Sequence, residues 1–123
     1  MLSLAQRNAE KAGLLPPRVT FQKAVLPELP LDNSTADIVI SNCVLNLLPE
    51  DQKPRIWIEI ERVLKPGGRV VISDILARKE MPPIIRDDIA QWTGCISGAS
   101  LVEEYKSYII AAGFEGKASF ALP

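Results

Sequence analysis

Residues 37–75, DIVISNCVLNLLPEDQKPRIWIEIERVLKPGGRVVISDI, decide the fold of this chain. The two ends of the stretch, residues 37–41 and 69–75, are apolar and β-branched, which is typical of strands buried in a parallel sheet. Residues 50–65 between them predict a helix, whose apolar side chains share one face at Ile56, Ile60, Val63 and Leu64. The order strand, helix, strand predicts a βαβ unit and an α/β fold.

The flanking sequence continues the alternation of helices and strands. Residues 2–12 predict a helix that ends at Gly13, and residues 27–34 are rich in turn-forming residues. A capping box from Ser100 to Glu103 predicts the start of a late helix that ends at Gly113. Further expectations are a short strand over residues 19–21, a helix from Pro82 to about Trp92, a loop over residues 94–98 and a last strand over residues 114–122.

Composition excludes several classes of function. The 123 residues suit one domain, and a formal charge of −1 gives no basic field for nucleic acid. The chain contains no histidine, so it cannot build a Ser-His-Asp triad or an HExxH zinc site. Its two cysteines are too few for a structural zinc site.

The sequence shows no targeting or membrane segment. The first residues form no apolar signal core, and no uncharged apolar run approaches the roughly 18 residues of a membrane span. We therefore expect a cytoplasmic protein with reduced thiols and no membrane partner. In a parallel sheet, ligands bind at the carboxyl ends of strands, which directs attention to the residues after Phe21, Ser41 and Ser73.

These motifs resemble the second half of class I S-adenosylmethionine-dependent methyltransferases. LPLDNSTADIVISN at residues 29–42 and RVLKPGGRVVISD at residues 62–74 are typical of that superfamily. The more specific resemblance is to arsenite methyltransferases, through SNCVLNL at residues 41–47 and WTGCISGA at residues 92–99. The resemblance implies a three-layer Rossmann-like fold, here as a single partial domain over residues 1–123.

The resemblance also implies a chemistry and a set of site residues. Cys43 and Cys95 correspond to thiols that bind trivalent arsenic, a soft centre suited to thiolate ligands. The arsenic lone pair attacks the methyl group of S-adenosylmethionine, so no general base is needed, and a thiol reductant is a further expected partner. By motif alignment, the residues nearest the cofactor are Val25, Leu26, Asn42 and Val44.

The chain also departs from the family pattern. It contains no G-x-G loop, and the first two strands, the ribose-binding acid and the last strand are expected to be missing. Val25 stands where the family commonly has an acidic residue that contacts the adenine amino group. A missing segment or a second chain would then be needed to complete the sheet. We expect this chain alone to bind S-adenosylmethionine weakly or not at all, which calorimetric titration would test.

Three functions remain open at this point. The first is methyl transfer to arsenite, in which both cysteines matter. The second is methyl transfer to another small-molecule acceptor, which would ignore both cysteines. The third is a non-catalytic remnant that associates through exposed sheet edges. Each cysteine also has a simpler interpretation, as a small buried residue for Cys43 and an inert loop residue for Cys95.

Overall fold

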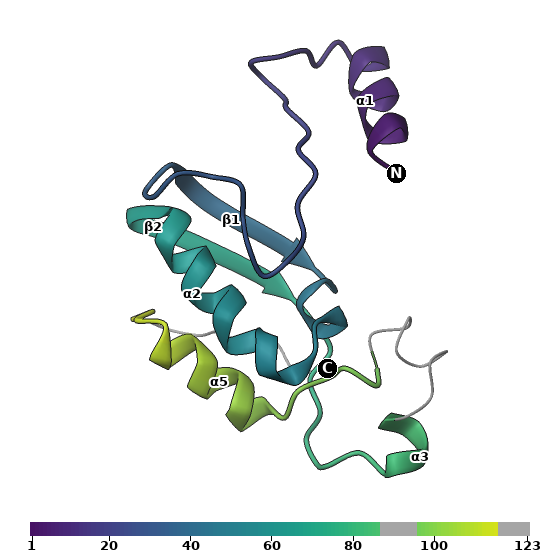
Figure 1. Ribbon diagram of the computed structural model, residues 1–123, viewed down its shortest axis with the longest axis vertical. Helices are drawn as coiled ribbons and strands as arrows, with labels where there is room; N and C mark the ends of the chain where they lie inside the picture. Colours follow the sequence, from purple (N-terminus) through teal and green to yellow (C-terminus); the bar gives the residue numbers. More distant parts are fainter. Residues whose placement is uncertain (87–95, 116–123) are drawn as a thin grey trace.

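The computed structural model describes residues 1–86 and 96–115 of the chain. Its helices and strands follow the alternation predicted from the sequence (Figure 1). In chain order they are α1 (Leu2–Lys11), β1 (Ala36–Asn42), the 3-10 turns η1 (Leu45–Leu47) and η2 (Glu50–Gln52), α2 (Lys53–Val63), β2 (Leu64–Ser73), α3 (Pro83–Arg86) and α5 (Val102–Ala111).

Strands β1 and β2 form a parallel pair joined by α2. The register runs from Ala36 opposite Leu64 to Asn42 opposite Ser73, with one irregularity between Ala36 and Ile38. Parallel strands need a crossover connection, and α2 supplies it. This confirms the βαβ unit predicted from residues 37–75, and both strands end at the same edge of the sheet (Figure 1).

The hydrophobic core lies between one face of the sheet and the helices α2 and α5. Trp57 of α2 is its centre, with the ring of Tyr105 at 5.4 Å and that of Phe114 at 5.7 Å, both edge-on. Edge-to-face packing of this kind adds to the gain from burial. Ile56 and Ile60 are buried on the same side of α2, as the spacing of the apolar residues predicts.

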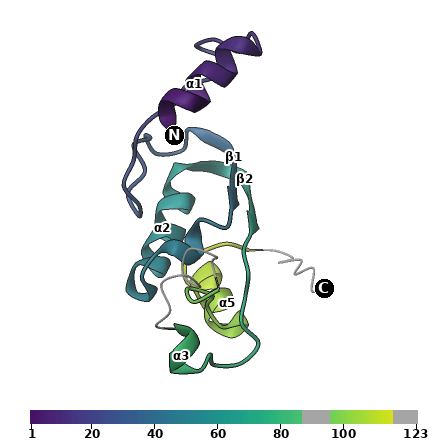
Figure 2. The same ribbon diagram turned by 90° about the vertical axis from the view of Figure 1, so that its right-hand side faces the viewer.

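The opposite face of the sheet is open in the part of the chain that the structure describes. The side chains of Ile40, Val71 and Ile38 are 75%, 56% and 48% exposed. Their neighbours Val39, Val70 and Ile72 point the other way and pack against the core. Figure 2 shows α2 on one side of the two strands, and both views show α1 standing apart from the sheet.

Several predicted boundaries need correction. The strand predicted over residues 19–21 is wrong, because these residues lie in irregular chain without a ladder partner among the described residues. The late helix begins one residue later than predicted: Leu101 is its N-cap, and its backbone N–H donates to Glu104 Oε2 at 3.3 Å. Ser100 and Glu103 therefore form no capping box. Ser100 instead binds side chains of the preceding elements.

The remaining predictions differ from the structure mainly at element ends. The helix predicted over residues 50–65 starts with the turn η2 and ends at Val63. Strand β2 begins directly after it at Leu64, earlier than the predicted residue 69, and Gly67 takes a positive φ within it. Gly13 and Gly113 likewise have positive φ after α1 and α5. Only residues 83–86 of the helix predicted from Pro82 are described. The predicted last strand lies almost entirely outside the described residues.

None of the helices in the described residues has the length and apolarity needed to cross a bilayer.

Candidate functional site

The carboxyl ends of β1 and β2 bring three segments of the chain together. Asn42 at the end of β1 pairs with Ser73 at the end of β2, and the backbone N–H of Cys43 donates to the Ser73 carbonyl at 2.8 Å. The chain beyond β2 then pairs with the start of α5, because the N–H of Ala77 donates to the Ser100 carbonyl at 2.9 Å. Residues 42–46, 74–77 and 97–101 thus meet at the edge where parallel sheets bind ligands.

Cys43 lies at this edge in an unusual backbone conformation. Its φ of 54° places it in the left-handed region, which non-glycine residues adopt at a cost of about 1–3 kcal/mol. The residue is half-buried, directly beyond the last ladder residue of β1. The sharp turn moves the chain out of the strand direction at the position where the sequence predicts a thiol ligand.

Asp74 is the acidic group next to Cys43. Its Oδ2 accepts a hydrogen bond from the hydroxyl of Tyr105 on α5 at 3.0 Å. Burial raises the pKa of Asp74, while the Tyr105 hydroxyl, the Cys43 backbone N–H and the charge of Lys53 act in the opposite direction. Burial and the nearby Asp74 carboxylate also raise the pKa of Tyr105. Tyr105 therefore stays protonated and links α5 to the end of β2.

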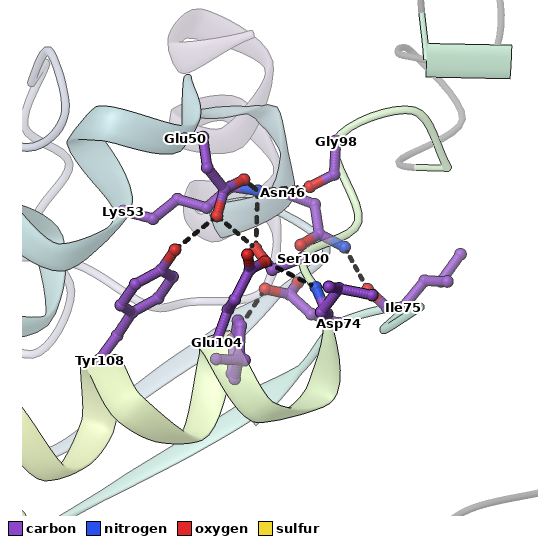
Figure 3. Close-up of polar contacts among 11 residues, drawn as sticks. Asn46, Glu50, Lys53, Asp74, Ile75, Gly98, Ser100, Glu104 and Tyr108 are labelled. Atoms are coloured by element: carbon purple, nitrogen blue, oxygen red, sulfur yellow. Dashed lines mark hydrogen bonds and ion pairs between the residues drawn. The ribbon is translucent and has the colours of Figure 1, made fainter. Parts of the chain in front are cut away.

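Gly98 packs directly on η1. A Cβ atom at Gly98 would lie only 1.8 Å from the carbonyl oxygen of Asn46. Asn46 is fully buried, and its side-chain amide donates to the Ile75 carbonyl at 2.7 Å (Figure 3). Asn46 therefore holds the residues after β1 to those after β2, and Gly98 lets the third segment approach both.

A buried lysine completes the contacts between these segments. Lys53, the first residue of α2, is 1% exposed. Its ammonium donates to Glu50 Oε2 at 2.7 Å, the Gly98 carbonyl at 2.5 Å and Ser100 Oγ at 2.8 Å (Figure 3). The second Glu50 oxygen accepts from Tyr108 at 2.7 Å and from Ser100 at 3.2 Å. We call these five residues the Lys53 cluster.

Glu50 is the counter-ion of the cluster. Burial raises its pKa, but the hydrogen bonds from Lys53, Tyr108 and Ser100 and the charge of Lys53 outweigh burial and lower it overall. Burial and the bond to Glu50 in turn raise the pKa of Tyr108. The carboxylate is therefore ionised at neutral pH, and the buried Lys53 charge is compensated.

The structure brings some of the predicted site residues together and leaves others apart. Asn42, Cys43 and Val44 lie side by side at the end of β1. Val25 and Leu26 lie on the irregular chain between α1 and β1, where Val25 is 78% exposed and Leu26 packs against the core. Cys95 lies outside the described residues.

The sequence interpretation missed the buried polar residues of this edge. Asn46, Lys53 and Tyr105 were not expected to form its framework, and Ser100 was assigned to a helix cap. One signal was present in the sequence. Lys53 stands on the buried stripe of α2, four residues before Trp57 and seven before Ile60, where an apolar residue is expected.

A family profile described as a methyltransferase domain matches residues 1–113. The chain belongs to the methyltransferase family. Its incomplete α/β architecture, with parallel strands joined by a helix, is the partial class I methyltransferase fold expected from the motifs.

Two arsenite methyltransferases are similar to this chain in sequence. An arsenite methyltransferase of Halobacterium salinarum is 40% identical over 115 residues, which are 94% of this chain and 28% of that protein. The human arsenite methyltransferase is 36% identical over 110 residues, which are 87% of this chain and 29% of that protein. The chain thus spans less than a third of the length of these relatives.

A solved methyltransferase structure is also similar to this chain in fold. The crystal structure of an arsenic(III) S-adenosylmethionine methyltransferase from Chlamydomonas reinhardtii superposes with a TM-score of 0.60 and 34% identity. The match covers 68% of this chain and 27% of that one.

A pocket of about 350 Å³ adjoins the Lys53 cluster. Residues 79–81 and 97–101 supply most of its lining, together with Glu50, Ala77 and Glu104. Neither Cys43 nor the residues predicted to contact the cofactor line it, and its walls carry three carboxylates. Among the described residues, the pocket is therefore separate from Cys43. Within residues 1–86 and 96–115, no group of three or more His, Cys, Asp or Glu side chains is placed to hold a metal ion.

Proposed function

We propose that this chain carries the arsenic-binding part of a methyltransferase that moves a methyl group from S-adenosylmethionine to trivalent arsenic. Cys43 and Cys95 are the two arsenic ligands. The proposal is supported by the relatives, whose names specify arsenite or arsenic(III) as the substrate. It is also supported by the two cysteine motifs at residues 41–47 and 92–99.

The observation that carries the proposal is the position of Cys43. Cys43 follows β1 with a positive φ, at the carboxyl edge of the sheet, where parallel sheets bind ligands. The Gly98 backbone contacts Asn46, three residues after Cys43, and Gly98 is itself three residues after Cys95. Three residues of chain span at most about 11 Å. Each cysteine is therefore at most about 11 Å of chain away from the contact between Asn46 and Gly98.

Two thiolates suit this reaction because trivalent arsenic is soft. S-adenosylmethionine supplies a methyl carbon on a positively charged sulfur. The arsenic lone pair forms the new bond to that carbon as the carbon–sulfur bond breaks and its electrons stay on sulfur. Arsenic is thereby oxidised from the trivalent to the pentavalent state, and a thiol reductant returns it. The protein's part is to hold arsenic at a fixed place and orientation.

The cofactor fits the residues of this chain only in part. Asn42 and Val44 flank Cys43 and offer an amide and an apolar side chain near the reacting centre. Val25 and Leu26 would flank the adenine ring, but valine cannot accept a hydrogen bond from the adenine amino group. The sequence has no G-x-G loop for the rest of the cofactor. We therefore expect weak binding of S-adenosylmethionine to this chain by itself.

Calorimetric titration of the chain with arsenite tests the two ligands. Cys43→Ser and Cys95→Ser should each weaken binding by on the order of 10²–10⁴-fold, because one thiolate loses the advantage of a second one tethered beside it. Val44→Ala keeps both thiols and should retain arsenite binding. Equal affinities in the wild type and both serine variants would instead favour a methyltransferase of another small molecule. Absence of both arsenite and cofactor binding would favour a non-catalytic remnant.

A further inference from the structure

Tyr105 joins helix α5 to the carboxyl end of β2 through a single hydroxyl group. The residue is 4% exposed, and its ring packs edge-on against Trp57 at 5.4 Å, which fixes its place in the core. Its hydroxyl donates to Asp74 Oδ2 at 3.0 Å, across 31 residues of sequence. A hydrogen bond to an ionised acceptor is stronger than one between neutral groups, so this bond holds Asp74 to α5.

Asp74 lies between two contacts that fix the turn after β1. The carbonyl of the preceding residue, Ser73, accepts the backbone N–H of Cys43 at 2.8 Å. The carbonyl of the following residue, Ile75, accepts the side-chain amide of Asn46 at 2.7 Å (Figure 3). The turn is thus held at both of its ends by the backbone on either side of Asp74.

The carboxylate of Asp74 also lies beside the backbone of Cys43. Burial raises the pKa of Asp74, and the Tyr105 hydroxyl and the Cys43 N–H counteract this by stabilising the charged form. Ser73 is the last residue of β2, where it pairs with the last residue of β1. Asp74 therefore lies just beyond the ladder of the sheet, and the bond from Tyr105 fixes its side chain instead.

We propose that Tyr105 is a positioning residue for the arsenic ligand Cys43, which it serves by holding Asp74 against the turn that carries the thiol. This inference rests on the proposed function, because a fixed Cys43 matters to the reaction only if its thiol binds arsenic. Cys43 has a φ of 54°, which residues other than glycine keep only when the surrounding structure imposes it. Tyr105 supplies part of that constraint from α5.

The hydroxyl of Tyr105 can be removed without removing its ring. Tyr105→Phe keeps the packing on Trp57 but takes the hydroxyl donor from a half-buried carboxylate. A buried acceptor that loses its partner favours a conformation in which water reaches it. Asp74 would then move outward together with its own backbone, and the adjoining Ser73 carbonyl would release the N–H of Cys43.

NMR of the Cys43 backbone amide tests this directly. Tyr105→Phe should speed its hydrogen exchange by on the order of tenfold, because a hydrogen bond to a charged group contributes about that factor to an equilibrium. The amide proton signal of Cys43 should also move upfield in the folded state, because its bond to Ser73 weakens. An unchanged exchange rate and an unchanged signal in Tyr105→Phe would overturn the proposal.

Tyr108→Phe is the matched control. It removes the same hydroxyl from the same helix, but that hydroxyl donates to Glu50 Oε1 at 2.7 Å rather than to Asp74. A general loss of stability would speed the exchange of Cys43 in both variants, whereas the proposal predicts a change in Tyr105→Phe alone. Equal acceleration in the two variants would therefore also count against the proposal.

A second substitution tests whether Tyr105 acts through Asp74. Asp74→Ala removes the acceptor and should itself speed the exchange of the Cys43 amide. Adding Tyr105→Phe to Asp74→Ala should change the rate no further, because both substitutions remove one shared interaction. Additive effects would show that Tyr105 acts by another route. Should Tyr105→Phe not fold, Asp74→Ala decides by itself, and an unchanged Cys43 rate there refutes the proposal.

Calorimetric titration with arsenite separates this inference from the proposed function. Tyr105→Phe should weaken arsenite binding by on the order of tenfold, because small misplacements of a reacting group strongly reduce its effective concentration. A wild type that binds no arsenite contradicts the proposed function, and the exchange rates then still show whether Tyr105 fixes the Cys43 turn. Equal arsenite affinity in the wild type and Tyr105→Phe, with different Cys43 exchange, would show that the constraint serves no arsenic site.

Discussion

Gly98 lets residues 97–100 pack directly against η1 because it has no side chain. Because a Cβ atom there would lie 1.8 Å from the Asn46 carbonyl oxygen, Gly98→Ala must push residues 97–100 away from η1. Overpacking of this kind costs about 1–3 kcal/mol, and urea unfolding should show that loss in the free energy of unfolding. Gly13→Ala is the control, because its Cβ would meet no atom within 4 Å and only the positive φ opposes it. A smaller loss for Gly98→Ala than for Gly13→Ala would contradict the close contact.

Single residues also show what the sequence could and could not predict. The strand predicted over residues 37–41 puts Cys43 just past its carboxyl end, and the structure confirms that position. Lys53 was missed, because a buried lysine depends on acceptors that lie 45 and 47 residues away in the chain. Periodicity shows that position 53 faces the core, but only the folded chain shows which carbonyl and hydroxyl groups meet it.

At the scale of elements, Glu59 and Arg62 attach the loop before β1 to α2. Arg62 donates to Glu59 and to the carbonyls of Leu29 and Leu31, and Glu59 also accepts the backbone N–H of Leu29. The hydrogen bond from Arg62, then that from Leu29, lowers the pKa of Glu59 from 4.5 to about 2. This pairing joins residues 29–31 to the last turns of the helix.

The lowered pKa of Glu59 predicts how the stability of the fold changes with pH. The contribution of Glu59 is fully present above its unfolded pKa of 4.5 and is lost as pH falls through its folded pKa of about 2. Glu59→Gln should therefore be less stable than the wild type at pH 6, and the difference should shrink steadily as the pH is lowered below 4.5. Urea unfolding across this range measures it. Glu61→Gln, an exposed charge change on the same helix, is the control, and equal pH dependence in both variants would contradict the prediction.

The elements that the sequence predicted well are those that local pattern determines. α1, α2 and the two strands follow from apolar periodicity and β-branched runs. The strand expected over residues 19–21 failed because strand formation needs a neighbour, and the described chain gives those residues none. The helix start at Leu101 was misjudged for a related reason, since Ser100 is bound by Lys53 and Glu50 rather than by the helix.

On the scale of the whole molecule, the described residues cover one face of the sheet and leave the other face open. In the described chain, the ring contacts join Trp57 of α2 to Tyr105 of α5 and to Phe114 just after α5, on the covered side of β1 and β2. The other side presents Ile38, Ile40 and Val71 to solvent. A two-stranded sheet has two unpaired edges, and apolar faces and open strand edges favour association. The matched part is less than a third of the length of the two arsenite methyltransferases.

The open face predicts self-association of this chain in isolation. We expect sedimentation velocity to show oligomers whose fraction rises with protein concentration. Ile40→Lys places a charge at the centre of the open face and should shift the distribution toward monomer, because a lysine there opposes the burial of Val71 and Ile38. Val25→Lys is the control, since Val25 is equally exposed but lies on the irregular chain before β1. A wild-type chain that stays monomeric at all concentrations would show that this apolar face is tolerated in water without a partner.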